Sequence, residues 1–434
     1  MTEPIVLLHL SDLHFGKNSR FAHEDHKEFG AGLGQAVQEE AERRGFKKKP
    51  DLVIVTGDVA QQALPSEYKN AIEFFGGLVG QTGVDRERFV FLPGNHDVAW
   101  NKCIQVQVAL EGEDITEDQL EPTMEKEKFA PFEKFKKDFL DGDPTAPPTP
   151  LACGAFVYDF RDLRVSVAAL NSCEEETHKK HGGELSSQQA QALMDHWSTT
   201  PVDAWIKIAA IHHNPGDPPQ EVVEEYREFL KNVKKKKGLS TELINHFLAD
   251  VAGFNGKKYL KELCKGRQVQ LVLHGHQHED AHESWPWSGI GNTHVLSAGS
   301  MGLAGNKLPK DQPNQVQLVV LDPDNERLRA HYLMYDPRKI PKDKVKSGHF
   351  VPDSAKDDEN EQVLCLPEGW QTTSEAAKPP SPPPADSTPF VREYRKALDG
   401  LYARWDLRNV GTTGPARPFR SNWDRRRRAR THGP

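Results

Sequence analysis

The sequence predicts an α/β fold in which helices cover a β-sheet. Eight short apolar or β-branched runs are each bounded by turn residues, which is typical of buried strands. Polar, helix-favouring segments at residues 26–44 and 66–79 separate the earliest runs, and such alternation favours the α/β class. The predicted strands are residues 5–10, 52–55, 89–92, 155–160, 165–170, 206–211, 269–273 and 316–321.

Two insertions interrupt this pattern, at about residues 98–150 and 216–262. The first carries four phenylalanines at helical spacing, which predicts an amphipathic helix that packs on the domain. The second contains the basic run 234–237, which we expect to be a solvated face. The four phenylalanines are Phe129, Phe132, Phe135 and Phe139.

The 434 residues divide into a predicted folded domain, residues 1–345, and a tail. Residues 346–389 are polar and then proline-rich, ending in KPPSPPPADSTP, which predicts an extended linker. Residues 390–434 contain a predicted amphipathic helix followed by a basic, mostly disordered end. The apolar stripe of this helix is Val391, Tyr394, Leu398, Leu401 and Trp405.

Composition narrows the class of protein. The net charge of −8 argues against a surface built throughout for nucleic acid or an anionic membrane. The five cysteines are scattered and form no C-x-x-C pair, which favours a reducing compartment and argues against a thiolate metal site. The first apolar run, at residues 5–10, is far shorter than the ~20 residues of a membrane helix. We therefore expect a cytoplasmic protein that does not enter a membrane.

Five short polar motifs stand at the ends of predicted strands. SDLH follows the first strand, TGD the second, PGNHD the third, HHNP the strand at 206–211, and HGHQH the strand at 269–273. Ligands of open α/β sheets bind outside the carboxyl ends of strands, so the five motifs are expected to face one site.

The residues in these motifs have the chemistry of metal ligands. In an extended backbone residues i and i+2 point the same way, so Asp12 and His14 are expected to form one pair of ligands, and His276 and His278 another. The mixed nitrogen and oxygen donors suit Mn, Fe or Zn, and their number exceeds what one ion takes from protein. Two ions that share a carboxylate are therefore predicted. The candidate ligands are Asp12, His14, Asp58, Asn95, His212, His276 and His278.

Together these motifs resemble the signature of the calcineurin-like metallophosphoesterase superfamily: D-x-H, G-D, G-N-H-[DE], H and G-H-x-H. The resemblance covers about residues 4–335. It is strongest to the branch that contains the class III cyclic-nucleotide phosphodiesterases. The implied fold is a sandwich of two mixed β-sheets flanked by helices.

The resemblance also implies roles for single residues. Asp12, His14 and His278 would hold the first ion, Asn95, His212 and His276 the second, and Asp58 would bridge the two. His213, beside His212 in the HHNP motif, is the alternative ligand to its neighbour. His96 would lie near the substrate as a general acid, and Asp97 would either orient His96 or cap the following segment. We expect His96 to point away from Asn95 because successive residues of an extended chain alternate.

The implied activity is hydrolysis of a phosphodiester, with a nucleotide-like or cyclic-nucleotide substrate. The expected reaction is in-line attack by a hydroxide that bridges two divalent transition-metal ions, catalysed further by Asp58 and His96. The alternatives are a phosphomonoesterase or a nuclease with the same metal site, the latter favoured weakly by the basic run at 425–430, and a non-enzymatic scaffold. Every motif residue is present, which argues against the scaffold.

A second resemblance concerns residues 390–411. The stretch YRKALDGLYARWDLRNVG is similar to the region that joins an N-terminal effector to a NACHT-type NTPase in bacterial conflict and signalling proteins. It implies a regulatory protein partner for this segment and a role as an effector in signalling or defence. The alternative is a helix that docks on its own domain.

Overall fold

The computed structural model describes most of the chain from residue 3 to residue 370. Compact packing divides the chain into two units, Met1–Thr373 and Ser374–Pro434, and every described residue belongs to the first. The predicted helix at residues 390–411 therefore lies outside the described residues. Within 3–370 the description omits residues 18, 48, 111–116, 143, 179, 181, 217–253, 306–307, 309–311, 336–349 and 354–360.

The first sheet contains the strands that carry the three N-terminal motifs. Its order is β13-β12-β11-β1-β2-β3, and β14 also pairs with β12. The strands β1, β2 and β3 run parallel, whereas β11 to β14 add antiparallel pairs, so the sheet is mixed. The strands are β1 Ile5–Leu10, β2 Leu52–Val55, β3 Phe89–Phe91, β11 Asn314–Asp322, β12 Arg327–Tyr335, β13 Val351–Pro352 and β14 Glu361–Val363.

The second sheet carries the two histidine-rich motifs. Its order is β4-β5-β6-β7-β8-β10-β9. The four central strands β6, β7, β8 and β10 are parallel, and antiparallel pairs close both edges. The strands are β4 Thr149–Pro150, β5 Phe156–Phe160, β6 Val165–Ala169, β7 Ile206–Ala210, β8 Leu271–His274, β9 Ala281–Trp287 and β10 Gly291–Ser297.

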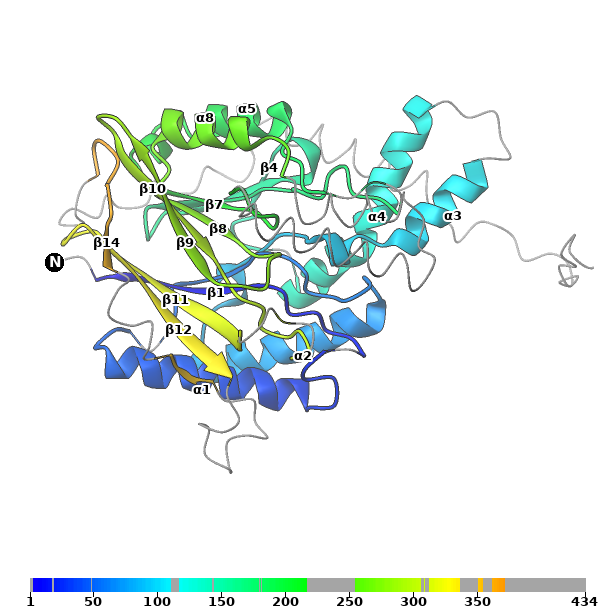
Figure 1. Ribbon diagram of the computed structural model, residues 1–434, viewed down its shortest axis with the longest axis horizontal. Helices are drawn as coiled ribbons and strands as arrows, with labels where there is room; N and C mark the ends of the chain where they lie inside the picture. Colours follow the sequence, from blue (N-terminus) through cyan, green and yellow to red (C-terminus); the bar gives the residue numbers. More distant parts are fainter. Residues whose placement is uncertain are drawn as a thin grey trace, which may run out of the picture. The chain divides into compact units, whose positions relative to one another are not determined.

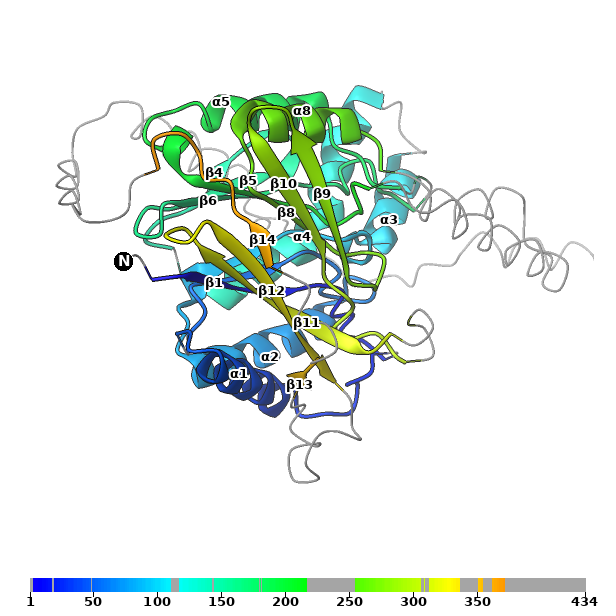
Figure 2. The same cartoon turned by 60° about the vertical axis from the view of Figure 1, so that its left-hand side comes forward.

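The two sheets pack face to face between two layers of helices, as Figures 1 and 2 show. Alternate residues of the central strands of both sheets meet in one apolar core, to which Leu7 contributes from β1 and Ile208 from β7. On the outer side of the first sheet, a second core is formed with α1 His26–Arg43, α2 Pro65–Thr82 and α4 Glu117–Leu140. The helices α5 Ser187–His196 and α8 Lys257–Arg267 cover the second sheet. The predicted sandwich of two mixed sheets is confirmed.

Most predicted elements have their counterparts in the structure. All eight predicted strands are present, and their ends agree within two residues. Three of the four phenylalanines of the first insertion, Phe132, Phe135 and Phe139, are buried against the first sheet and its helices, as the helical spacing predicted. Most of the second insertion, residues 217–253, lies outside the described residues.

The folded unit extends beyond the boundary predicted at residue 345. Both β13 and β14 pair with β12, and the side chains of Phe350 and Leu364 are buried in the cores on either side of the first sheet. These strands are only two and three residues long, too short to produce a periodic pattern in the sequence.

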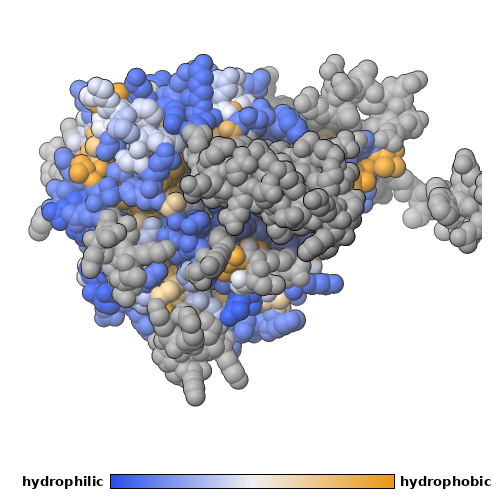
Figure 3. Space-filling view, viewed as in Figure 1, coloured by the Kyte–Doolittle hydropathy of each residue, from blue (hydrophilic) through white to orange (hydrophobic). Residues whose placement is uncertain are grey.

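Among the helices that the structure describes, none has both the length and the apolar character needed to cross a membrane. The face in Figure 3 is mainly hydrophilic, with small hydrophobic patches. Exposed apolar residues on α3 Trp100–Leu110 include Ile104 and Val108.

Candidate functional site

The five motifs meet at the carboxyl ends of the parallel strands from both sheets. Hydrogen bonds join their loops: the amide of His14 donates to the carbonyl oxygen of Asp58 at 2.9 Å, and the amide of Gly275 donates to that of His212 at 3.0 Å. The structure brings together all seven predicted ligands. Asp12, His14, Asp58, Asn95 and His212 are buried, and His276 and His278 are partly buried.

The backbone at this site is not extended, contrary to the reasoning from the sequence. Asp12, His14, Asp58, His276 and His278 have φ values between 47° and 71°, in the left-handed region that only glycine enters freely. The Asp12/His14 pair and the His276/His278 pair do reach the same centre, but through these left-handed turns rather than through strand geometry. Such unfavourable backbone is retained mainly at functional sites, where the surroundings hold it in place.

Asp12, His14 and His278 form the first candidate ligand group. Oδ1 of Asp12 lies 3.8 Å from Nε2 of His14 and 3.4 Å from Nδ1 of His278. Its other oxygen, Oδ2, accepts a 3.0 Å hydrogen bond from the amide of His276. Asp12 Oδ1 and His278 Nδ1 are buried and have no hydrogen-bond partner within the described part of the chain. A cation among these atoms would satisfy them.

His212 and Asn95 form the centre of a second group. The Nδ1–H of His212 donates to the carbonyl oxygen of Thr56 at 2.7 Å, because a carbonyl can only accept. Burial lowers the pKa of His212 to about 3, so its ring is neutral and Nε2 carries a lone pair. That lone pair faces Oδ1 of Asn95 at 3.0 Å and Nδ1 of His276 at 3.2 Å. Two acceptors that face each other in this way fit a cation bound between them.

Asp58 lies between the two groups. Its Oδ2 is 3.7 Å from Nε2 of His14, and its Oδ1 is 3.5 Å from Nε2 of His212. Burial raises the pKa of the Asp58 carboxyl group. The charge of His96 and the hydrogen bond from the His96 amide oppose this shift only in part. The loop after β3 approaches very closely, since a Cβ atom at Gly94 would lie 2.1 Å from Oδ1 of Asp58. This contact explains why glycine precedes Asn95 in the motif.

His96 stands at the edge of this centre. It belongs to a 3₁₀ turn, Asn95–Asp97, so the alternation expected of an extended chain does not apply. Its amide donates to Oδ1 of Asp58 at 2.9 Å, and its Nδ1 donates to the carbonyl oxygen of Gln61 at 2.8 Å. The ring also meets His14 edge-on, with 4.8 Å between ring centroids. His14, Asp58 and His96 are a third group able to hold an ion.

Asp97 has a role that the sequence left open. Its two carboxylate oxygens accept hydrogen bonds from the amides of Val59, Ala60 and Gly94, at 2.9–3.1 Å. The bond to Gly94 caps the 3₁₀ turn, and the other two tie this turn to the loop after β2. Asp97 therefore fixes the positions of Asp58 and Asn95 relative to each other.

The structure separates the two adjacent histidines of HHNP. His213 is directed to a cluster that sequence reasoning missed: Nδ1 lies 2.8 Å from the hydroxyl of Ser172, and Nε2 lies 3.9 Å from the carboxylate of Glu176. The stretch ALNSC contains Ser172, but no spacing in it predicts this contact. His212 faces Asp58 and Asn95, so the geometry favours His212 over His213 as the ligand.

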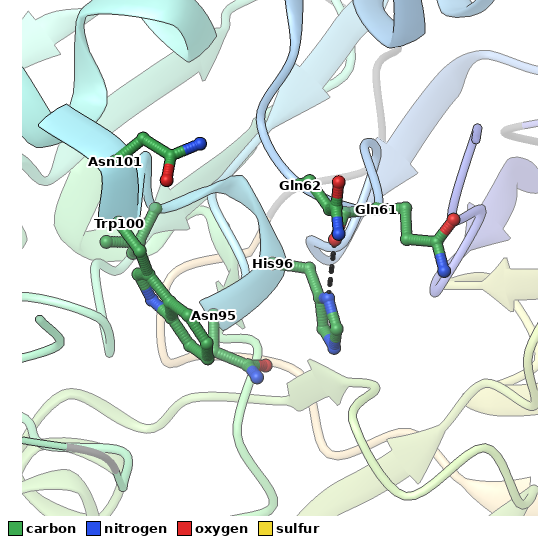
Figure 4. Close-up of a pocket in the computed structure, with 7 residues that line it drawn as sticks. Gln61, Gln62, Asn95, His96, Trp100 and Asn101 are labelled. Atoms are coloured by element: carbon green, nitrogen blue, oxygen red, sulfur yellow. Dashed lines mark hydrogen bonds between the residues drawn. The ribbon is translucent and has the colours of Figure 1, made fainter. Parts of the chain in front are cut away.

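A cavity of about 200 Å³ opens beside the centre. Asn95 and His96 form its boundary with the candidate ligands, and Gln61, Gln62, Trp100 and Asn101 line the rest (Figure 4).

Comparison with known proteins agrees with this arrangement. Residues 5–280 match the family described as calcineurin-like phosphoesterase. Over 98 residues, 21% of this chain, the sequence is 32% identical to glycerophosphodiester phosphodiesterase GpdQ from Enterobacter lignolyticus. The matched part spans only 30% of that relative's length.

Solved structures show more distant likeness. GAP50 of Plasmodium, described as the anchor in the inner membrane complex, aligns with 10% identity over 84% of this chain and 89% of its own, with a TM-score of 0.38. The 5′-nucleotidase of Candida albicans aligns with 11% identity over 80% of this chain and 54% of its own, with a TM-score of 0.34. Since the family match covers well over half of the sequence, this chain belongs to the calcineurin-like phosphoesterase family.

Proposed function

We propose that this protein is a metal-dependent phosphodiesterase that acts on a nucleotide-like or cyclic-nucleotide substrate and requires two divalent transition-metal ions. The observation that carries the proposal is the unprotonated Nε2 of His212, which faces Oδ1 of Asn95 across 3.0 Å. Asp58 lies within 3.5 Å of this nitrogen and 3.7 Å of His14, as a carboxylate shared between two ions would. The relative GpdQ, a phosphodiesterase by name, supports the choice of a diester.

The donors fit Mn, Fe or Zn. Imidazole nitrogens and carboxylate or amide oxygens are the ligands these metals take, and no cysteine is among the candidates. Bound there, two divalent ions would attract an anionic diester and acidify water for attack on phosphorus. Asp12, His14 and His278 would hold one ion, Asn95, His212 and His276 the other, and Asp58 would contact both.

His96 is proposed as the acid that protonates the leaving oxygen. The carbonyl oxygen of Gln61 requires a proton on Nδ1, so Nε2 is the ring nitrogen that would carry the transferred proton. Only the doubly protonated ring can donate from Nε2, and such general acid catalysis is typically worth ~10²–10⁴-fold in rate.

The test is metal content measured together with a substrate panel. The purified protein is analysed by elemental mass spectrometry, stripped with a chelator, reloaded with Mn and assayed on four kinds of substrate. These are bis-p-nitrophenyl phosphate, p-nitrophenyl phosphate, cyclic nucleotides and single-stranded DNA or RNA. We expect two ions per chain and hydrolysis of the diesters that is lost on chelation and restored by Mn. Activity that survives exhaustive chelation would refute the proposal.

The panel also separates the alternative activities. Preference for the monoester would indicate a phosphomonoesterase, and cleavage of the polynucleotides would indicate a nuclease. A protein that holds no stoichiometric metal and hydrolyses nothing would be a scaffold. A cytoplasmic location and a regulatory partner for residues 390–411, which lie outside the described residues, remain predictions from the sequence.

A further inference from the structure

The cavity beside His96 is lined mainly by uncharged polar side chains. Apart from His96, the residues that line it among those the structure describes are four carboxamides, Val98 and Trp100. In this part of the chain neither a carboxylate nor an ammonium group lines the cavity. Its occupant is therefore expected to be neutral, partly apolar and able to form hydrogen bonds.

The side chains that face the cavity come from two segments, the loop after β2 and the stretch from the 3₁₀ turn to the start of α3. Figure 4 shows the indole of Trp100 and the imidazole of His96 on opposite sides, with the carboxamides of Gln62 and Asn101 above them. The side chain of Gln61 points away from the others, and its backbone carbonyl holds His96. One aromatic face and two amide groups thus surround a space that opens toward the candidate ligands.

Both segments are held by contacts outside the cavity. The buried carboxylate of Glu67 accepts hydrogen bonds from the amides of Gln62 and Leu64, at 2.8 and 3.1 Å. The start of α3 is fixed because Val98 and Cys103 pack against Phe129, and the amide of Ala99 donates to the carbonyl oxygen of Lys128 at 2.9 Å. Trp100 is nevertheless 39% exposed, which is high for a tryptophan on an anchored helix.

We infer that this cavity binds the nucleobase of the substrate, with Trp100 stacking on the ring and the carboxamides of Gln62 and Asn101 bonding to its edge. The inference rests on the proposed diesterase activity and names the part of the substrate that determines specificity. Every base has a π face for an aromatic side chain, and carboxamides can both donate to and accept from the edge of a base. The cavity is smaller than the ~300–1,000 Å³ of sites that enclose a drug-sized ligand, so it suits one ring system.

The walls fit the head group of a glycerophosphodiester less well. An ethanolamine ammonium favours a carboxylate, and a choline favours a cage of several aromatic rings. The cavity has neither among its described residues, since Trp100 is its one aromatic side chain apart from the imidazole of His96. A neutral planar ring can stack on Trp100 and form hydrogen bonds with the carboxamides that line the cavity.

The test compares two diesters on the Mn-loaded protein. One, 2′,3′-cyclic AMP, has a base, and the other, glycerophosphoethanolamine, has none. Trp100→Ala is expected to lower kcat/KM for the cyclic nucleotide by about 5- to 150-fold, the range for removing one stacking aromatic, mainly through KM. The loss on glycerophosphoethanolamine should be at least fivefold smaller. Trp100→Phe, which keeps a ring, should retain most of the activity on the nucleotide.

Ile104→Ala is the matched control, because Ile104 lies one turn further along α3, is 44% exposed and does not line the cavity. It should change neither rate. Equal losses on both diesters in Trp100→Ala, or no loss on the nucleotide, would overturn the inference and leave the diesterase proposal intact.

A binding measurement separates the two proposals if neither diester is hydrolysed. Equilibrium dialysis of AMP with the metal-loaded protein measures binding without hydrolysis, and the comparison of variants isolates the contribution of the cavity. A Kd at least fivefold weaker for Trp100→Ala than for the wild type, with Ile104→Ala unchanged, supports base binding although the proposed activity fails. Equal Kd values in all three proteins overturn base binding as well.

Discussion

The carboxylate of Asp97 accepts a 3.0 Å hydrogen bond from the hydroxyl of Tyr68, a residue of α2 that stacks on Phe135 of α4. The same carboxylate binds three backbone amides of the loops after β2 and β3. One buried side chain thus connects two covering helices to the loops that carry Asp58 and Asn95. The positions of these candidate ligands depend on it.

Asp97→Asn is therefore expected to be severe although it changes one atom. Both oxygens of Asp97 accept from N–H groups, so the NH₂ of an asparagine would face at least one donor. Each buried donor left without an acceptor costs about 1–3 kcal/mol. We expect the free energy of unfolding to fall by about 2–4 kcal/mol in urea titrations, with weaker metal retention. Tyr68→Phe, which removes a single bond, should cost about 1 kcal/mol. An Asp97→Asn protein as stable as Tyr68→Phe would contradict this account.

The second prediction concerns the shared carboxylate. Asp58 approaches both His14 and His212 with different oxygens, at 3.7 and 3.5 Å. Asp58→Asn should therefore purify with neither ion fully retained, whereas Asp12→Asn should keep more metal. Elemental analysis of both variants measures this. Asp162→Asn, an exposed carboxylate paired with Arg88, is the control and should retain the metal of the wild type. Equal losses in the first two variants would make Asp58 an ordinary ligand.

Leaving-group dependence tests His96. If it protonates the leaving oxygen, His96→Ala should lose little on a p-nitrophenyl ester, because a stable phenolate departs without help, and about 10²-fold or more on an alkyl or nucleoside diester. Both metals should remain bound. The two rates are measured on the same Mn-loaded preparation.

Two other results are informative for His96. Equal losses on the two kinds of ester would assign it to stabilisation of charge in the transition state. Loss of metal would make it a ligand, which its place in a group with His14 and Asp58 allows.

The sequence predicted that the candidate residues lie together at strand ends, but not the backbone geometry that brings them there. Asp12, Asp58 and His276 were identified because each follows an apolar run and a strand must end there. Their left-handed backbone was not foreseen, since φ > 0 at a residue other than glycine leaves no periodic signal. The Asp97 anchor was missed for a related reason: its donors at residues 59–60 are distant in sequence.

Strands were predicted where the sequence has an unbroken apolar run and missed where polar residues interrupt it. The strand β9 is an edge strand with mostly exposed residues and contains Pro286, so it lacks both signals of a buried strand. The strand β12 has His331 and arginines among its apolar residues. Both strands form through pairing with a neighbour, a tertiary effect that local composition does not show.

Truncation tests the revised boundary of the folded unit. A chain ending after Thr373 keeps β13 and β14 and should retain the melting temperature, metal content and hydrolysis of the whole protein. A chain ending at residue 345 loses the burial of Phe350 and Leu364, each worth about 1.5–3 kcal/mol. It should melt at a clearly lower temperature. If both truncated chains melt like the full protein, the last two strands contribute nothing to stability.

The last prediction concerns the pH dependence of stability and depends on His9 in β1. Its Nδ1 lies 3.0 Å from Oε1 of Gln317, and its Nε2 lies 3.0 Å from the hydroxyl of Thr56. Burial lowers the pKa of His9 from 6.5 to about 3, although the bond to Gln317 opposes the shift. The folded protein therefore binds the proton more weakly than the unfolded chain does. Stability is full above pH 6.5 and falls as the pH drops toward 3, because the unfolded chain takes up the proton first.

One such proton changes the free energy of unfolding by about 1.4 kcal/mol per pH unit, so His9 should account for about 2 kcal/mol between pH 7 and pH 5. Other buried histidines add to the total, and the test is therefore the difference between the wild type and His9→Gln. Urea titrations at both pH values, with chelator present so that metal release does not contribute, should show a smaller pH dependence in the variant by about that amount. His23→Gln, at an exposed position, should behave like the wild type. If His9→Gln loses as much stability on acidification as the wild type, protonation of His9 is not coupled to unfolding.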